Sequence, residues 1–287
     1  VFCRDCGWVA RCPRCDIPLT HHPGREALLC HRCGHHRSAP ARCPNCGGGR
    51  VRYFGAGTQR VQQELASLIP SARALRWDYD ATRTRGAHEV LLSHFAAHRA
   101  DVLIGTQMIA KGLDLPLVTL VGVVSADTGL HLPDFRAAER TFQLLTQVAG
   151  RAGRGLLGGR VILQTYHPDH EAIVAASKHD YEGFYRQELE HRRLLGYPPF
   201  QRLTRLVYRH PDPDRARREA ERVGRLVRRG LESAGDPTDM IGPAPCFFDR
   251  VRGDSRWQVV LRASDPRPLI PPLPEGWVVD VDPVTLL

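Results

Sequence analysis

This sequence has very few lysines, and it lacks long apolar runs and a phosphate-binding lysine loop. Only Lys111 and Lys178 are lysines among the 40 basic residues, and all the others are arginine. No apolar run approaches the roughly 18–20 residues that cross a bilayer, so we expect no membrane span. No G-x-x-x-x-G-K-[ST] loop and no D-E-x-H run occurs, which excludes a self-contained phosphate-loop nucleotide site within this chain.

The length and charge indicate a multidomain protein with a polyanionic partner. The 287 residues suffice for two or three domains of about 100–150 residues each. The net charge of +9 and the pI of about 9.4 favour nucleic acid as a partner, although an arginine bias from codon composition explains them equally well. The chain opens into a cysteine motif rather than a signal peptide, and Val1 is not methionine. We therefore expect a piece of a longer cytoplasmic protein.

Eight of the nine cysteines form four C-x-x-C pairs near the N-terminus. Two thiolates three residues apart on a tight turn can bind the same ion, and eight make two closed four-sulfur zinc sites of the structural kind. A secreted disulfide framework is the alternative, but such pairs without a signal peptide favour metal in a reducing compartment. The pairs are Cys3/Cys6, Cys12/Cys15, Cys30/Cys33 and Cys43/Cys46, and Cys246 stands alone.

The spacing of the pairs indicates which of them share an ion. Fourteen residues separate Cys15 from Cys30, which is close to the spacing of a zinc ribbon. We therefore expect the two inner pairs to bind one zinc ion and the two outer pairs to bind the other. Five nearby histidines could replace a cysteine, but eight thiolates already suffice, so we interpret them as solvated. They are His21, His22, His31, His35 and His36.

Beyond the cysteines, strand and helix patterns alternate. Such alternation predicts a parallel sheet with helices on both faces, in one doubly wound RecA-like lobe. Thr58 is the expected N-cap of the first helix. The expected strands lie at 51–54, 72–77, 101–105, 117–125 and 160–165, and the expected helices at 57–69, 86–98 and 134–152.

A third unit follows a helical stretch that ends near Leu195 and a break at 196–199. Strands at 203–209, 257–263 and 277–281 and a helix at 214–233 predict a small α+β domain with antiparallel strands. The helix carries seven arginines, which we interpret as a solvated face in preference to a nucleic-acid site. The expected domains are a zinc region at 1–49, the RecA-like α/β lobe at 50–175, and a connecting helix with the α+β domain at 176–287.

The stretch TQVAGRAGRG at 146–155 combines a glutamine with two arginines beside glycines. Glycines let the backbone approach a ligand, and guanidinium groups bind phosphate in a bidentate manner. Arg151 and Arg154 are three residues apart, so they share one face if the helix continues. This pattern is what an arginine finger needs, whereas an isolated match of this length is equally often a basic turn.

A second stretch, IGTQMIAKGLDLP at 104–116, favours the functional interpretation. A strand that ends at Thr106 and turns at Gly112 places polar groups at the carboxyl edge of a sheet, where open α/β sheets bind ligands. The two stretches resemble motifs V and VI of superfamily 2 helicases. Thr106, Gly112 and Asp114 match the pattern of motif V, and Gln147, Arg151 and Arg154 match that of motif VI.

The order of the parts, together with several longer motifs, resembles the C-terminal portion of the PriA family of bacterial replication-restart helicases. The motifs are CRDCGW at 3–8, RCPRC at 11–15, IGTQMIAKG at 104–112, DFRAAER at 134–140, QVAGRAGR at 147–154 and WVVDVDP at 277–283. The run Leu113-Asp114-Leu115 departs from our picture of the family, and the C-terminal domain matches only thinly outside Trp257-Gln258 and WVVDVDP.

This resemblance implies an ATP-hydrolysing helicase that unwinds DNA in the 3′-to-5′ direction and starts primosome assembly at stalled forks. It also implies two zinc ions in the nested arrangement and a monomeric protein. The implied partners are branched or single-stranded DNA, the single-strand-binding protein and other primosome proteins. We expect three groups of site residues. DNA would contact Thr106, Gln107 and Lys111; ATP with Mg²⁺ would face Gly112, Asp114, Arg151 and Arg154; and Gln147 would act with the two arginines in catalysis.

The missing phosphate loop means that this chain holds only half of an ATP site, so the fragment alone should be inactive. Two alternatives stay open at this point. One is a DNA-binding primosome-assembly protein whose first lobe is degraded and does not turn over ATP. The other is an unrelated zinc-ribbon nucleic-acid module. Gln147, Arg151 and Arg154 favour the motor, since a protein without turnover does not need them, and the WVVDVDP run disfavours the unrelated module.

Overall fold

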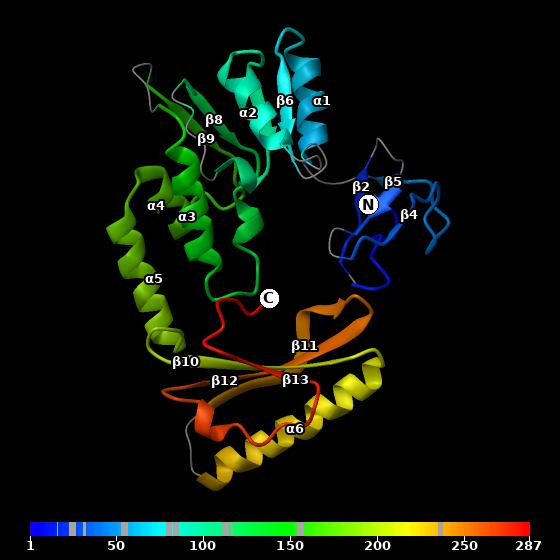
Figure 1. Ribbon diagram of the computed structural model, residues 1–287, viewed down its shortest axis with the longest axis vertical. Coiled ribbons are helices and arrows are strands. Elements are labelled where there is room, and N and C mark those ends of the chain that lie inside the picture. The colour runs from blue at the N-terminus through cyan, green and yellow to red at the C-terminus, as the bar shows by residue number, and fades with distance from the viewer. Residues whose placement is uncertain are drawn as a thin grey trace. The chain divides into compact units, whose positions relative to one another are not determined.

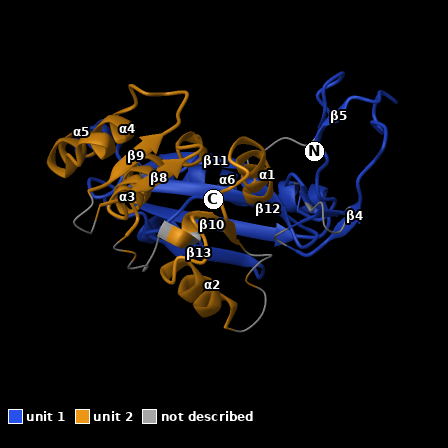
Figure 2. Ribbon diagram, turned by 90° about the horizontal axis from the view of Figure 1, so that it is seen from above, with its two compact units in different colours: residues 1–54, 133–135, 189–287 blue, residues 55–132, 136–188 orange. Residues whose placement is uncertain are grey.

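The computed structural model forms two compact units (Figures 1 and 2). Unit 1 comprises Val1–Phe54, Pro133–Phe135 and Leu189–Leu287, and unit 2 comprises Gly55–Leu132 and Arg136–Glu188. The two units are sets of residues in mutual contact and do not test domain boundaries, so the division into three domains stays a prediction. The structure describes residues 1–15, 17–22, 27–30, 33–52, 57–78, 82, 86–110, 115, 117–153, 158–234 and 238–287.

The cysteine-rich part of unit 1 is built from very short strands. The strands β2 (Thr20–His22), β3 (Ala27–Leu29) and β4 (His36–Ser38) form an antiparallel sheet in that order. A second pair joins β1 (Phe2–Cys3) to β5 (Val51–Arg52). The sequence predicts a strand at 51–54 as the first strand of the RecA-like lobe. Its described part, β5, instead pairs with β1 of the cysteine-rich region.

The C-terminal part of unit 1 is a four-stranded antiparallel sheet covered by one long helix, which confirms the small α+β domain. The strand order is β11-β12-β10-β13. Val223, Val227 and Leu231 recur at helical spacing and are buried with Leu206 and Leu261 of the sheet. The elements are β10 (Arg202–His210), α6 (Pro213–Ala234), β11 (Asp239–Val251), β12 (Asp254–Ala263) and β13 (Trp277–Val281).

The sequence pattern did not predict β11, although it has 13 residues. It contains Gly242, Pro243 and Pro245, which all disfavour a regular strand. The register shifts between Ile241 and Ala244 and again between Pro245 and Arg250. Because β11 lies at the edge of the sheet, it pairs only with β12 among the described strands. No second neighbouring strand therefore loses hydrogen bonds through the missing N–H groups of its prolines.

Unit 2 alternates strands and helices as expected for an α/β lobe. Among its described residues the strands form two parallel pairs, and the sheet is not continuous between them. The pairs are β6 (Ala74–Trp77) with β7 (Val102–Gly105) and β8 (Leu120–Val123) with β9 (Arg160–Leu163). The helices are α1 (Thr58–Leu68), α2 (Ala87–Ala96), α3 (Ala137–Ala149), α4 (Glu171–Lys178) and α5 (Tyr181–Leu195), the last of which continues into unit 1.

Two helix starts differ from the sequence prediction. Gly57 rather than Thr58 is the N-cap of α1, because the Thr58 hydroxyl donates to the Asp78 carboxylate instead of to its own helix. The helix expected from Asp134 begins at Ala137, since Asp134 and Phe135 belong to unit 1. Packing fixes the rest of α3: Phe142 is buried and its ring stacks on Phe184 of α5 with the centroids 4.3 Å apart.

Candidate metal centres and helicase motif residues

Three of the four C-x-x-C pairs close a tight backbone turn onto a following glycine. The N–H of Gly7 donates to the carbonyl oxygen of Cys3 at 3.0 Å, and Gly34 and Gly47 repeat this bond with Cys30 and Cys43 at 2.9 and 2.8 Å. These three glycines directly follow the second cysteine of their pairs and have φ values of 73°, 75° and 70°. Only glycine adopts this left-handed conformation without strain, which is why the motif reads C-x-x-C-G there.

The eight sulfur atoms gather into two clusters, each within 4.8 Å. One cluster contains Cys3, Cys6, Cys43 and Cys46, and the other contains Cys12, Cys15, Cys30 and Cys33. This is the nested arrangement that the spacing predicts.

The spacing of the sulfur atoms fits tetrahedral zinc. The Sγ atoms of Cys3 and Cys46 are 3.7 Å apart, and those of Cys12 and Cys33 are 3.6 Å apart. Four sulfurs bonded to one ion at about 2.3 Å would be about 3.8 Å apart, so these separations match. They are far longer than a disulfide bond of about 2.05 Å, and all eight cysteines are free thiols in the structure.

Hydrogen-bond donors point at the sulfurs, as thiolate ligands require. Backbone N–H groups of Asp5 and Arg14 donate to Cys3 Sγ and Cys12 Sγ, both at 3.4 Å. The Asn45 amide donates to Cys6 Sγ at 3.5 Å and lowers the pKa of Cys6 to about 6. Such donors stabilise the negative charge on sulfur, and their presence at both clusters agrees with two structural zinc ions.

The turn between β11 and β12 contacts the inner cluster, which here means Cys12, Cys15, Cys30 and Cys33. The N–H of Gly253 donates to the Arg14 carbonyl at 3.0 Å, and Arg250 Nη1 donates to the Pro13 carbonyl at 3.1 Å. The backbone N–H of Arg252 also donates to Cys15, whose pKa burial nevertheless raises to about 12. The C-terminal domain thus supports the loop that carries two ligands of this site.

In unit 2, the residues of the motif VI stretch lie at the end of α3. Gln147 is exposed in the last turn, and Arg151 is half-buried in the turn that follows, where its N–H donates to the Val148 carbonyl at 3.0 Å. Gly153 has a φ of 74°, and a Cβ there would lie 2.6 Å from the nitrogen of Gly159. Glycine is therefore needed for the chain to turn this closely. Arg154 lies outside the described residues.

The motif V stretch leaves the carboxyl end of β7. Thr106 and Gln107 are exposed there, directly after the parallel strand pair ends. The short 3₁₀ helix η2 (Gln107–Ala110) contacts α3, so α3 connects the two motif stretches. Lys111, Gly112 and Asp114, which we expected to contact DNA or nucleotide, lie outside the described residues.

Two buried carboxylates of unit 2 were not identified from the sequence. Asp78 follows β6 next to Thr106 across the strand pair, accepts a hydrogen bond from Thr58 and lies 2.8 Å from Arg76 Nε. Asp127 follows β8 and accepts from Thr165 Oγ1 at 2.6 Å, which lowers its pKa. An acidic residue directly after a strand was the signal available for Asp78, whereas Asp127 lies four residues beyond the end of β8 and had no such signal.

The seven arginines of α6 are exposed, in agreement with a solvated face. Arg222 pairs with Glu219 at 2.8 Å, and Arg217 lies 3.7 Å from Asp214.

No helix among the described residues is both long and apolar enough to cross a membrane.

Comparisons with known protein families first define the class. Residues 46–155, which include the motif residues of unit 2, match the model described as "Helicase conserved C-terminal domain", so this stretch is similar to a helicase lobe. Residues 12–37 match "PriA DNA helicase Cys-rich region (CRR) domain", and residues 193–284 match "Primosomal protein N C-terminal domain". The predicted resemblance to the C-terminal portion of PriA is therefore confirmed, with the three regions in the predicted order.

Individual relatives agree with the family models. The chain is 50% identical over 262 residues to "Replication restart protein PriA" of Bacillus subtilis strain 168 and 43% identical over 266 residues to that of Synechocystis sp.. Each alignment covers 91% of this chain and 32% of the relative. The protein of the same name from Treponema pallidum is 43% identical over 299 residues, covering 99% of this chain and 44% of that protein. The chain thus spans less than half the length of these relatives.

Proposed function

We propose that this chain is the second motor lobe, zinc region and C-terminal domain of an ATP-dependent helicase that restarts replication. The helicase unwinds DNA in the 3′-to-5′ direction, recognises stalled forks and begins primosome assembly in the cytoplasm. One observation carries the proposal: α3 presents Gln147 and Arg151 at one end and contacts η2, which follows the exposed Thr106. The names of the relatives support the role in replication restart.

The chemistry assigned to α3 is stabilisation of charge during phosphoryl transfer. The transition state spreads negative charge over the oxygens of the transferred phosphoryl group, and a positioned guanidinium stabilises that charge. Arg151 and Arg154 supply guanidinium groups, and Gln147 orients the attacking water. A preceding lobe holds most of the nucleotide and its Mg²⁺, while Gly112 and Asp114 complete the pocket from this side.

DNA binds through its phosphates at the carboxyl end of β7. Thr106 offers a hydroxyl group and the start of η2 offers backbone N–H groups, with Gln107 and Lys111 beside them. Such contacts position a strand without reading its sequence. The protein therefore prefers branched or single-stranded DNA by its structure, and its affinity falls steeply with salt.

The two zinc ions hold the cysteine-rich region together and take no part in turnover. With four thiolates each, the sites have no open position for water or substrate. The full-length protein acts as a monomer, and its other partners are the single-strand-binding protein and further primosome proteins.

The second candidate function is a non-motor primosome-assembly protein with a degraded first lobe. The chain spans 32% of the relatives from Bacillus and Synechocystis, so the phosphate loop that would distinguish this candidate from the motor is not part of it. The two candidates differ in ATP turnover and not in DNA binding.

A strand-displacement assay with the full-length protein separates the candidates. Two forked substrates would carry a single-stranded tail of either polarity, and ATP hydrolysis would be followed in parallel. The motor predicts ATP-dependent unwinding from the 3′ tail, hydrolysis that requires DNA, and none by this chain alone. Tight fork binding without any hydrolysis would refute the motor and establish the assembly protein.

A further inference from the structure

The last residues of the chain bind a carboxylate that precedes α3. Thr285 Oγ1 and the backbone N–H of Leu286 both donate to Asp134 Oδ2, the latter at 3.3 Å. The N–H of Leu287 donates to the same threonine hydroxyl at 3.2 Å, so this hydroxyl accepts one hydrogen bond and donates another. Asp134 is only 9% exposed, and a buried carboxylate requires such donors. Figure 1 shows the C-terminus beside this part of the chain.

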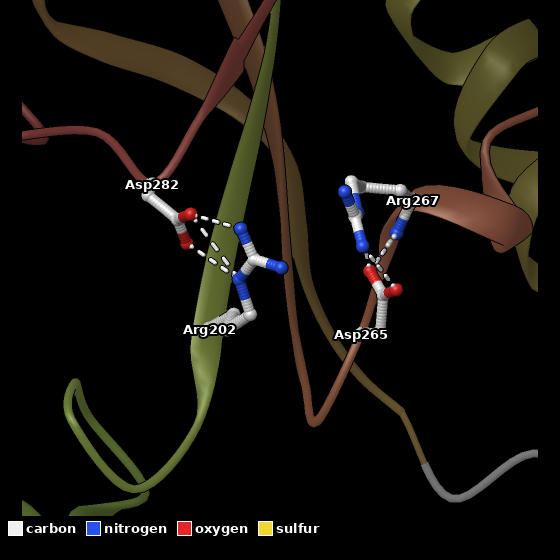
Figure 3. A network of polar contacts seen from close by, with 4 residues as sticks. All are labelled: Arg202, Asp265, Arg267 and Asp282. Atoms are coloured by element: carbon white, nitrogen blue, oxygen red, sulfur yellow. Dashed lines mark hydrogen bonds and ion pairs between the residues drawn. The ribbon is translucent and has the colours of Figure 1, made fainter.

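The same tail is attached firmly to the sheet of the C-terminal domain. Arg202 on β10 donates to Asp282 through Nε at 3.1 Å and forms an ion pair with it where β13 ends (Figure 3). The buried Arg205, also on β10, donates to the Leu287 carbonyl oxygen at 3.1 Å and to Gln258 on β12. The tail therefore joins Asp134 to two strands of this sheet.

Phe135, the residue after Asp134, adds aromatic contacts to the C-terminal part of unit 1. Its ring stacks on Tyr197 with centroids 5.5 Å apart and planes 17° apart. The guanidinium of Arg192 lies 5.4 Å from the centre of the Phe135 ring, and that of Arg262 lies 5.3 Å from the Tyr197 ring. We call Asp134, Phe135, Tyr197 and Thr285 the tail clasp.

The clasp is three residues from a helicase motif helix. Asp134 precedes the first residue of α3, Ala137, and the 13 residues of this helix end just before Arg151. An α-helix of this length is about 20 Å long and transmits displacement of one end to the other. A displacement of Asp134 with the C-terminal domain therefore reaches Gln147 and Arg151 through the covalent structure of the helix.

We infer that Asp134 is a positioning residue, through which the C-terminal domain sets the position of α3 and makes ATP turnover depend on what that domain binds. This inference rests on the proposed function. The carboxylate of Asp134 accepts hydrogen bonds from Thr285 and Leu286. It acts by holding one end of α3, so loss of the clasp weakens the stimulation of ATP hydrolysis by DNA and leaves hydrolysis without DNA unchanged.

Two substitutions of Thr285 in the full-length protein test the inference. Thr285→Val removes the hydroxyl and keeps the shape, whereas Thr285→Ser keeps the hydroxyl. We expect the valine variant to lose at least about fivefold of its stimulation by forked DNA, the lower end of typical couplings between sites. Its unstimulated rate, KM for ATP and Kd for the fork should stay within about twofold, and the serine variant should behave as wild type. Arg267→Ala is the control, because it breaks the other ion pair in Figure 3 and does not touch the clasp.

Hydrogen exchange on the same full-length variants shows whether the clasp has opened. In Thr285→Val the amides of residues 284–287 and of the first turn of α3 should exchange faster, with those of α6 unchanged. Faster exchange with full stimulation by DNA overturns the positioning role, and unchanged exchange overturns the clasp itself. A wild-type protein without any ATPase would refute the proposed function instead, while the exchange comparison would still test the clasp.

Discussion

Substitution of single cysteines tests the nested metal centres most sharply, because the two pairings give opposite results. Cys3→Ser should release only the outer ion, which Cys3, Cys6, Cys43 and Cys46 hold. The double variant Cys3→Ser/Cys46→Ser, with both changes in the outer cluster, should therefore keep one zinc ion per chain. The double variant Cys3→Ser/Cys12→Ser has one change in each cluster and should keep none.

The size of the effect follows from sharing the binding free energy among the ligands. Structural zinc sites have apparent binding free energies of about 10–16 kcal/mol, or roughly 2.5–4 kcal/mol for each of four thiolates. Loss of one ligand therefore weakens a site on the order of 10²–10³-fold. Sulfur separations of 3.6–3.7 Å within the outer cluster fit a site that uses all four thiolates.

The assay is metal analysis after equilibration with a chelator that the wild-type sites resist. Two zinc ions are expected for the wild type, one for Cys3→Ser, one for Cys3→Ser/Cys46→Ser and none for Cys3→Ser/Cys12→Ser. Pairing in sequence order, with Cys3, Cys6, Cys12 and Cys15 on one ion, would exchange the results of the two double variants. That exchange, or fewer than two ions in the wild type, would refute the reasoning.

Three further expectations concern other parts of the chain. Gly153→Ala should lower the free energy of unfolding by about 1–3 kcal/mol in thermal or urea denaturation, since the new methyl would lie 2.6 Å from the Gly159 nitrogen; an unchanged midpoint would contradict this. Arg250→Ala should make a chelator remove the inner ion about two- to tenfold faster and leave the outer ion unaffected, because Arg250 supports the loop of the inner ligands. Arg73 lowers the pKa of Asp101 to about 2, so this pair stabilises the protein above the ordinary aspartate pKa of about 4 and stops doing so as the pH falls towards 2. Asp101→Asn should accordingly flatten the pH dependence of unfolding in that window, and an unaltered acid transition would argue against it.

Local chemistry explains what the sequence could predict. The zinc clusters were predictable because a C-x-x-C-G turn determines its own backbone shape, as the φ values of Gly7, Gly34 and Gly47 show. The helices and most strands follow hydrophobic periods of 3.6 and 2 residues. By contrast, β11 was missed because Gly242 and Pro243 interrupt its pattern, and only pairing with β12 makes it a strand.

Contacts between distant residues explain what could not be predicted. No local pattern indicates that Thr285 binds Asp134, since 151 residues separate them. That contact also moved the start of α3 to Ala137, although the sequence around Asp134 favours a helix. Likewise, Thr58 looked like an N-cap until the fold placed its hydroxyl beside Asp78.

Turnover of ATP by arginine variants of the full-length protein tests the central claim most directly. DNA-stimulated hydrolysis would be measured for wild type, Arg151→Ala and Arg154→Ala, with lysine variants as controls that keep the charge but lose the planar guanidinium. The account predicts that Arg154→Ala lowers the rate by about 10³-fold or more and that Arg154→Lys rescues it poorly, with fork affinity and zinc content nearly unchanged. Normal turnover by both alanine variants would contradict the assignment of α3 and the turn that follows it to the ATP site.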